Sequence, residues 1–218
     1  MARRLRGTAG LFKIGSRLFT AEGPRAVEKL AGLGFGIFLD LKFHDIPNTV
    51  AGAVAAAADL PKVRLLTVHT LGGIAMMRAA REAVARKRNR PAVLGVTVLT
   101  SLDADALRRA GISGSPASRA LALARLAKEA GIDGVVASAH EARAIRRACG
   151  RNFLIVVPGV RPASTSVNDQ SRVATPAEAI RAGADYLVIG RPITAAANPR
   201  AAALAIAEEI ASATRRSR

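Results

Sequence analysis

Residues 36–69 have the sequence GIFLDLKFHDIPNTVAGAVAAAADLPKVRLLTVH, in which two short apolar runs flank an Ala-rich stretch. The runs at 36–40 and 65–69 are almost continuously apolar, which is typical of parallel strands covered on both faces. The stretch at 50–59 has the composition and period of a helix. This segment therefore predicts a β-α-β unit, whose two strands run parallel because a helix connects them.

The same alternation continues along the rest of the chain. Pro24, Pro176 and Pro199 stand where a first-turn proline is tolerated, and Thr175 and Glu178 have capping-box spacing. Alternating elements with no linker between them predict one α/β domain, residues 1–218, built on a parallel sheet. We expect strands at 11–15, 36–40, 65–69, 92–99, 134–138, 154–158 and 186–189, and helices at 24–33, 50–59, 74–88, 117–130, 139–148, 176–182 and 199–211.

An eight-stranded (β/α)8 TIM barrel is the architecture closest to this pattern. The competing doubly wound sheet lacks support, because no G-x-G-x-x-G follows the first predicted strand. A barrel needs an eighth strand, since an open seam leaves backbone groups unpaired. Residues 1–10 have the pattern of a helix end and a turn. We therefore expect the first β-strand and most of the first helix of the barrel to be missing, with poor solubility or weak activity as the consequence.

Composition excludes several classes of protein. The chain has 218 residues and a formal net charge of +17, which would suit a nucleic-acid partner. However, aromatic residues make up only 3% of the chain, too few for a base-stacking platform, and the basic residues are dispersed. Apolar residues make up 50% of the chain, which excludes global disorder. No apolar stretch reaches the length of about 18 residues that suggests a membrane span. We expect neither a nucleic-acid nor a membrane partner.

Cysteine and histidine are scarce. One cysteine excludes a disulfide framework and fits a reducing compartment, so we expect a cytoplasmic protein. Three dispersed histidines argue against a His-rich metal site, so we expect no metal.

Charged residues gather at the end of the second predicted strand. Asp40, Lys42 and Asp45 form the pattern D-x-K-x-x-D, and residues two apart on a strand face the same side. Lys13 ends the preceding strand and can reach the same space. Catalytic side chains of barrel enzymes stand at these strand ends. The pattern favours a charged catalytic pocket over a surface network of ion pairs.

Glycine–arginine pairs follow the last two predicted strands. Gly159 precedes Arg161 after one strand, and Gly190 precedes Arg191 after the next. Barrels commonly bind phosphate at this position, through backbone N–H groups and Arg. The polar stretch 161–172 between them has the composition of a loop that could close over a ligand, or of an ordinary surface loop.

These motifs, in this order, resemble the orotidine 5′-phosphate decarboxylase family. The resemblance implies a TIM barrel and a carboxy-lyase that converts orotidine 5′-monophosphate (OMP) to uridine 5′-monophosphate (UMP) in de novo pyrimidine biosynthesis. It also implies a homodimer and no cofactor. The stretches that carry it are FKIG (12–15), FLDLKFHDIPNTV (38–50), TVHTLGG (67–73), GVTVLTS (95–101), VVPGVRP (156–162) and GADYLVIGRPIT (183–194).

The resemblance also implies a role for each matching residue. Lys42 resembles the proton donor to C6 of the pyrimidine, and Asp40 resembles the carboxylate beside the substrate carboxylate. Lys13 resembles the lysine that joins this network and the ribose. Asp45, with Ile46 and Thr49, resembles the segment that crosses to the partner subunit's site. Thr100 and Ser101 resemble the pyrimidine contacts, Pro158 the apolar wall, and Arg161, Gln170, Gly190 and Arg191 the phosphate-binding set.

One departure keeps alternatives open. The family opens with a strand ending in Ala-Leu-Asp, whose Asp contacts the ribose, and residues 1–10 have no counterpart to it. The alternatives are another sugar-phosphate decarboxylase or lyase of the same superfamily, an inactive truncated chain, or a non-enzymatic basic protein. The Thr100-Ser101 pair speaks against the sugar-phosphate lyase.

Overall fold

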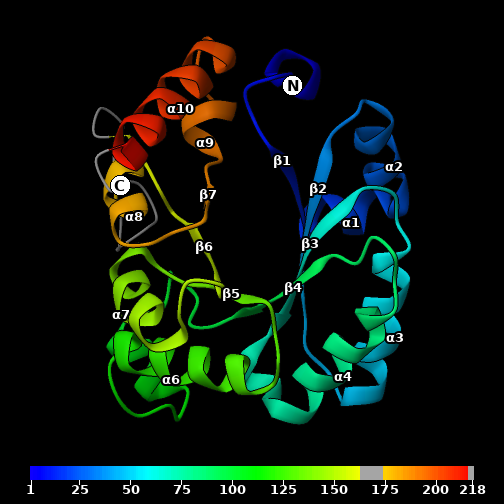
Figure 1. The fold of residues 1–218 in the computed structure, drawn as a ribbon, viewed down its shortest axis with the longest axis vertical. Coiled ribbons are helices and arrows are strands. Elements are labelled where there is room, and N and C mark those ends of the chain that lie inside the picture. Colours follow the sequence, from blue (N-terminus) through cyan, green and yellow to red (C-terminus); the bar gives the residue numbers. More distant parts are fainter. Residues whose placement is uncertain (163–173, 216–218) are drawn as a thin grey trace.

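Seven parallel strands in the order β1-β2-β3-β4-β5-β6-β7 form the centre of the molecule (Figure 1). This computed structural model describes residues 1–162 and 174–215. Each strand pairs with the next one along the chain, as the β-α-β pattern predicts. The strands are β1 (Leu11–Gly15), β2 (Gly36–Phe43), β3 (Val63–His69), β4 (Ala92–Val96), β5 (Gly134–Val136), β6 (Leu154–Pro158) and β7 (Tyr186–Val188).

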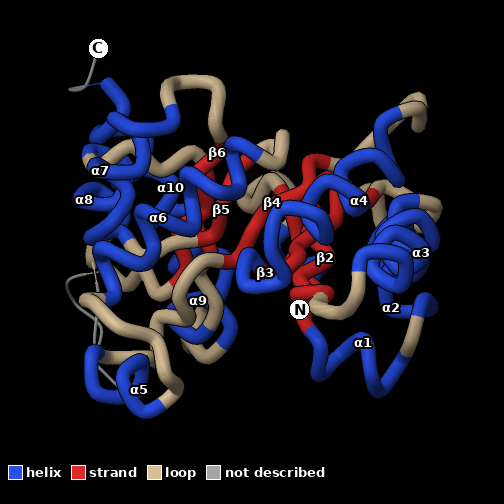
Figure 2. The backbone as a smooth tube through the Cα atoms, turned by 90° about the horizontal axis from the view of Figure 1, so that it is seen from below, coloured by secondary structure: helices blue, strands red, loops and turns tan. Residues whose placement is uncertain are grey.

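Helices surround these strands on the outside (Figure 2). N-capping residues determine where several helices begin. The hydroxyls of Ser115 and Ser138 each accept a hydrogen bond from a backbone amide in the first turn of a helix. The predicted capping box of Thr175 and Glu178 is confirmed. The helices are α1 (Ser16–Glu22), α2 (Pro24–Gly32), α3 (Pro47–Ala58), α4 (Gly73–Ala85), α5 (Ala104–Arg109), α6 (Pro116–Glu129), α7 (Ala139–Cys149), α8 (Pro176–Arg181), α9 (Arg191–Thr194) and α10 (Pro199–Arg215), with 3-10 turns at η1 (Ala2–Leu5) and η2 (Thr70–Gly72).

Strand residues alternate between two apolar clusters. In β2, Ile37 and Leu39 join the large cluster that packs against the helices, whereas Phe38 points to the other side. Phe38 packs there with the matching residues of the other strands, which identifies this second cluster as the barrel interior. Its members are Leu11, Phe38, Leu65, Ala92, Leu94, Val136, Leu154, Val156 and Val188.

The barrel of described strands is open between its first and last members. β1 and β7 are the two ends of the strand order and flank the open side (Figure 1). A cavity of about 450 Å³ lies between them and is lined mainly by apolar residues of β1, β7 and α10. The finding of seven parallel strands in a nearly closed barrel agrees with the expected fold class.

Several element boundaries differ from the predicted ones. β2 continues to Phe43 beyond the predicted end at residue 40, because an irregularity in its pairing with β3 lets it resume after Asp40. β4 ends at Val96, although the Thr97 amide still donates to the Val136 carbonyl at 3.1 Å. The short helices α1, α5 and α9 are additional to the predicted ones, since four to seven residues carry too little periodicity.

Two aspartates brace the N-terminal ends of neighbouring strands in the same way. Asp133 precedes β5 and accepts a hydrogen bond from the Val93 amide of β4 at 2.8 Å. Asp185 precedes β7 and accepts one from the Ile155 amide of β6 at 2.7 Å. Each carboxylate also pairs with an arginine. These contacts join adjacent strands at the end of the barrel remote from the charged D-x-K-x-x-D segment.

Asp133→Ala tests this bracing. Its carboxylate binds Arg90 through two hydrogen bonds of 2.9 and 3.0 Å, and its loss also leaves a part-buried amide without this acceptor. We expect the free energy of unfolding, measured in urea, to fall by about 1–3 kcal/mol. Asp105→Ala is the matched control, because Asp105 is exposed and pairs with the exposed Arg108 and Arg109, and a change below about 0.5 kcal/mol is expected. Equal losses in the two variants would contradict the bracing role.

Candidate active site

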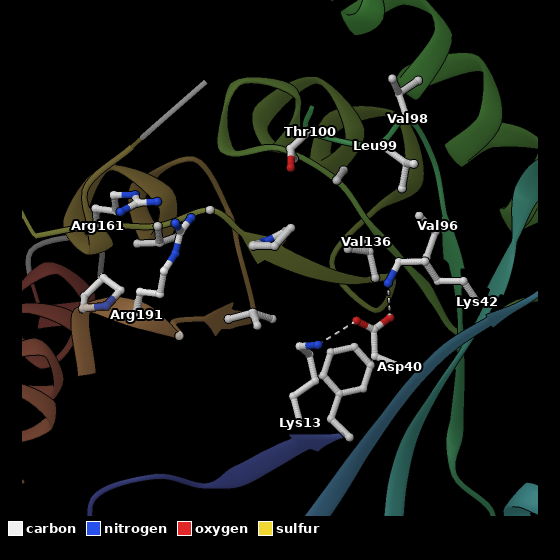
Figure 3. A pocket seen from close by; sticks show the side chains of 18 residues that line it. Lys13, Asp40, Lys42, Val96, Val98, Leu99, Thr100, Val136, Arg161 and Arg191 are labelled. Atoms are coloured by element: carbon white, nitrogen blue, oxygen red, sulfur yellow. Dashed lines mark hydrogen bonds and ion pairs between the residues drawn. The ribbon is translucent and has the colours of Figure 1, made fainter. Parts of the chain in front are cut away.

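A cavity of about 300 Å³ opens at the C-terminal ends of the strands (Figure 3). It begins where the apolar barrel interior ends, because the inward-facing alternation continues from Phe38 to Asp40 on β2. On β6 the same alternation leads from Val156 to Pro158. The lining residues are Lys13, Phe38, Asp40, Lys42, Val96, Val98, Leu99, Thr100, Val136, Ala137, Pro158, Gly159, Val160, Arg161, Val188, Gly190, Arg191 and Pro192.

A carboxylate between two ammonium groups occupies one end of this cavity (Figure 3). The Lys42 Nζ lies 2.9 Å from Asp40 Oδ1, and the Lys13 Nζ lies 3.0 Å from Asp40 Oδ2. Asp40 is only 8% exposed, whereas both lysine side chains reach the cavity and are about one-third exposed. The network therefore presents cationic groups to a ligand and keeps its anion mostly behind them.

Electrostatics keeps Asp40 ionised. Burial by itself would raise the pKa of Asp40, but the charge of Lys13 and the hydrogen bond and charge of Lys42 outweigh it and hold the pKa below its usual value. At neutral pH the carboxylate is thus charged. It balances one of the two cations, so the three groups together carry a net charge of +1.

A bulge in β2 sets the position of Lys42. Leu39 pairs with Leu66 and Phe43 pairs with Val68, so the three residues 40–42 lie opposite Thr67 alone. Lys42 takes a left-handed backbone conformation with φ of 53°, which costs a residue other than glycine on the order of 1–2 kcal/mol. Sequence alternation predicts that Asp40 and Lys42 share a face, and both do line the cavity. The bulge between them gives no signal in the sequence.

Thr67 is a site residue that the predicted set lacks. It lies on β3, fully buried beside the bulge. Its Oγ1 donates to Asp40 Oδ1 at 3.0 Å and accepts from the Lys42 amide at 2.9 Å. The sequence signal that could have pointed to it is its place as the first residue of TVHTLGG (67–73), one of the stretches that carry the family resemblance.

Two arginines mark the opposite end of the cavity (Figure 3). Arg161 follows β6 and is buried, and its amide donates to the Ala174 carbonyl at 3.0 Å. Arg191 begins α9 directly after Gly190. Figure 3 shows the two guanidinium groups close together and away from Asp40. Such a pair suits a dianionic group such as a phosphate ester.

Most, but not all, of the predicted residues line the cavity. Lys13, Asp40, Lys42, Thr100, Pro158, Arg161, Gly190 and Arg191 do so. Asp45, Ile46 and Thr49 are exposed and outside the lining, as is Ser101. Gln170 lies outside the described residues. The apolar wall of Val96, Val98, Val136 and Val188 is additional to the predicted set.

The described part of the chain offers neither a cluster of metal ligands nor a membrane-spanning helix. No three His, Cys, Asp or Glu side chains within 1–162 and 174–215 are grouped so that they could hold a metal ion. Over the same residues, no helix combines the length and apolarity needed to cross a membrane.

Comparison with known proteins shows the family. The profile of the orotidine 5'-phosphate decarboxylase / HUMPS family matches residues 1–206. The chain belongs to this family. Relatives named orotidine 5'-phosphate decarboxylase come from Nitrosococcus oceani, 53% identical over 96% of this chain and 90% of the relative, and from Moorella thermoacetica, 57% identical over 95% and 84%.

Solved structures agree with this assignment. The orotidine 5'-phosphate decarboxylase of Lactobacillus acidophilus is 39% identical, with a TM-score of 0.80 over 91% of this chain and 85% of that one. The enzyme of Pyrococcus horikoshii is 25% identical, with a TM-score of 0.76 over 96% and 91%. The TIM-barrel fold and the family predicted from the motifs are thus confirmed.

Proposed function

We propose that this protein is a carboxy-lyase that decarboxylates OMP to UMP in pyrimidine biosynthesis. One observation carries the proposal: a single cavity holds the Lys13–Asp40–Lys42 network at one end and Arg161 with Arg191 at the other. OMP has a matching layout, with a carboxylate on its pyrimidine ring and a phosphate on its ribose. The family and the curated relatives named for this activity support the same function.

The chemistry requires a cation close to the reacting carbon. When the C6–carboxylate bond breaks, carbon dioxide leaves and the electron pair stays on C6, where no carbonyl can delocalise it. We assign Lys42 to donate its Nζ proton to C6, after which solvent reprotonates the amine. Asp40 holds the Lys42 ammonium in position, and Lys13 adds a second positive charge beside the developing carbanion.

We propose that the remaining predicted residues bind the substrate. We assign Arg161, Gln170, Gly190 and Arg191 to the phosphate, and Thr100 and Ser101 to the pyrimidine. We assign Pro158, which also lines the cavity, to the apolar surface beside the departing carbon dioxide. Binding energy from the remote phosphate then helps to hold C6 against Lys42.

The direct test uses substrates that differ in one group. We expect loss of OMP with formation of UMP, and a much lower rate with orotidine, which lacks the phosphate. Decarboxylation or cleavage of another sugar phosphate, with OMP unchanged, would instead support the related lyase.

We further propose a homodimer in which Asp45 and its neighbours reach the partner subunit's site. Ile46 is 65% exposed and Leu71 is 50% exposed. The stacked rings of His44 and His69, with centroids 5.3 Å apart, hold together the two segments that carry them. An exposed apolar pair beside an exposed Asp45 fits the edge of a subunit interface.

We also propose that residues 1–218 form one domain. From the scarcity of cysteine we further propose that the protein works in the cytoplasm.

Mixed dimers test the shared site. Lys42→Ala and Asp45→Ala should each be nearly inactive alone. In co-expressed mixed dimers, however, one of the two sites regains both residues. Random pairing then restores about one quarter of the wild-type turnover per subunit. Activity no greater than the sum of the two parents would contradict the cross-subunit role of Asp45.

A further inference from the structure

We infer that Thr67 is a positioning residue that holds Asp40 and Lys42 in the geometry that decarboxylation needs; this inference rests on the proposed function. Thr67 is not in contact with the cavity, because it is fully buried and absent from the lining. Any effect on the reaction must therefore pass through the two residues it binds.

The direction of both hydrogen bonds is determined by chemistry. The Lys42 backbone N–H can only donate, so the Thr67 Oγ1 must accept from it at 2.9 Å. The hydroxyl proton of Thr67 is then free to donate to Asp40 Oδ1 at 3.0 Å. One hydroxyl thus uses its donor on one catalytic side chain and an acceptor position on the backbone of the other.

The bulge explains why a side chain is needed there. In regular pairing the amides of β2 find acceptors on the β3 backbone, but residues 40–42 bulge out opposite Thr67. The Thr67 hydroxyl takes the place of a backbone acceptor for the Lys42 amide. It thereby stabilises the left-handed backbone at Lys42, which directs the Nζ back to Asp40 Oδ1.

Thr67 also fixes the carboxylate. Asp40 Oδ1 receives Lys42 Nζ and Thr67 Oγ1, while Oδ2 faces Lys13 Nζ. Of these donors, the Thr67 hydroxyl alone is fully buried and neutral. The Thr67 hydroxyl can therefore keep the Asp40 carboxylate in a fixed orientation while the two ammonium groups move to contact the substrate.

Thr67→Val removes the hydroxyl at nearly constant shape. We expect kcat for OMP to fall about tenfold and KM to change less than about threefold, because the lost interaction acts on the reacting groups and not on phosphate binding. Thr67→Ser, which restores the hydroxyl, should recover kcat to within about threefold of wild type. Thr70→Val is the matched control, since the equally buried Thr70 Oγ1 donates to the Val96 carbonyl at 2.8 Å and lies outside the cavity lining.

A second readout does not depend on activity. Hydrogen exchange at the Lys42 amide should quicken by at least about tenfold in Thr67→Val and stay near wild type in Thr67→Ser and Thr70→Val. Thr67→Ala provides the same test if the Val variant does not fold. Unchanged kcat and exchange in the folded variant, or a Ser variant as impaired as Val, would overturn the inference. A wild-type chain inactive toward OMP would refute the proposed function, while the exchange experiment would still decide whether Thr67 holds the bulge.

Discussion

Lys42→Ala abolishes decarboxylation of OMP, with an expected loss of turnover of about 10³-fold or more. In the proposed mechanism two effects combine, because Lys42 is both the proton donor to C6 and one of the two cations beside the developing carbanion. The loss should appear in kcat at saturating substrate, since the arginine end of the cavity is untouched. The measurement is the change in pyrimidine absorbance as OMP becomes UMP.

The control for Lys42→Ala must remove a lysine without touching the site. Lys29 is suitable, because its ammonium pairs with Glu22 at 2.9 Å on the exposed surface formed by α1 and α2. Lys29→Ala should retain wild-type turnover. If Lys42→Ala kept near-normal turnover while folded, Lys42 would not be the proton donor, and the assignment of the network would be wrong.

Arg191→Ala weakens the binding of OMP, with KM rising about 10²-fold and kcat changing much less. Charge-assisted hydrogen bonds to a phosphate are each worth about 1.5–3 kcal/mol, and a guanidinium can make two of them. Arg191 lines the cavity at the end opposite Lys42, so its loss leaves the reacting groups in place. Steady-state kinetics with OMP measures the separate effects on KM and kcat.

A control variant and a control substrate separate phosphate binding from other effects of Arg191→Ala. Arg181→Ala removes the same charge from α8, outside the cavity lining, and should leave KM unchanged. Orotidine has no phosphate, so Arg191→Ala should not alter its slow reaction. An equal loss with OMP and orotidine would show that Arg191 supports the fold or the pyrimidine end and not the phosphate.

Sequence patterns predict most of this fold because strand and helix periods are local. Continuous apolar runs such as residues 154–158 coincide with a strand, and the alternation on β2 separates Phe38 from Ile37 and Leu39. The ends of elements depend on tertiary contacts and follow less closely. β2, for example, extends to Phe43 only because its pairing with β3 resumes after a bulge.

Some residues of the candidate site can likewise be predicted from the sequence, and others cannot. Charged residues on apolar strands, such as Asp40 and Lys42, stand out in the sequence because their burial demands a reason. Thr67 does not, because a threonine is an ordinary strand residue and its importance comes from the bulge across from it. The valines of the apolar cavity wall cannot be recognised from the sequence either, because valines that face a ligand have the same sequence pattern as valines of the core.

The most direct test of the central claim is the stoichiometry of the reaction catalysed by the purified 218-residue chain. We predict that one UMP forms and one carbon dioxide is released for each OMP consumed, and that both products are lost together in Lys42→Ala. A folded wild-type chain that consumes no OMP, or that forms UMP equally well without Lys42, would contradict the account.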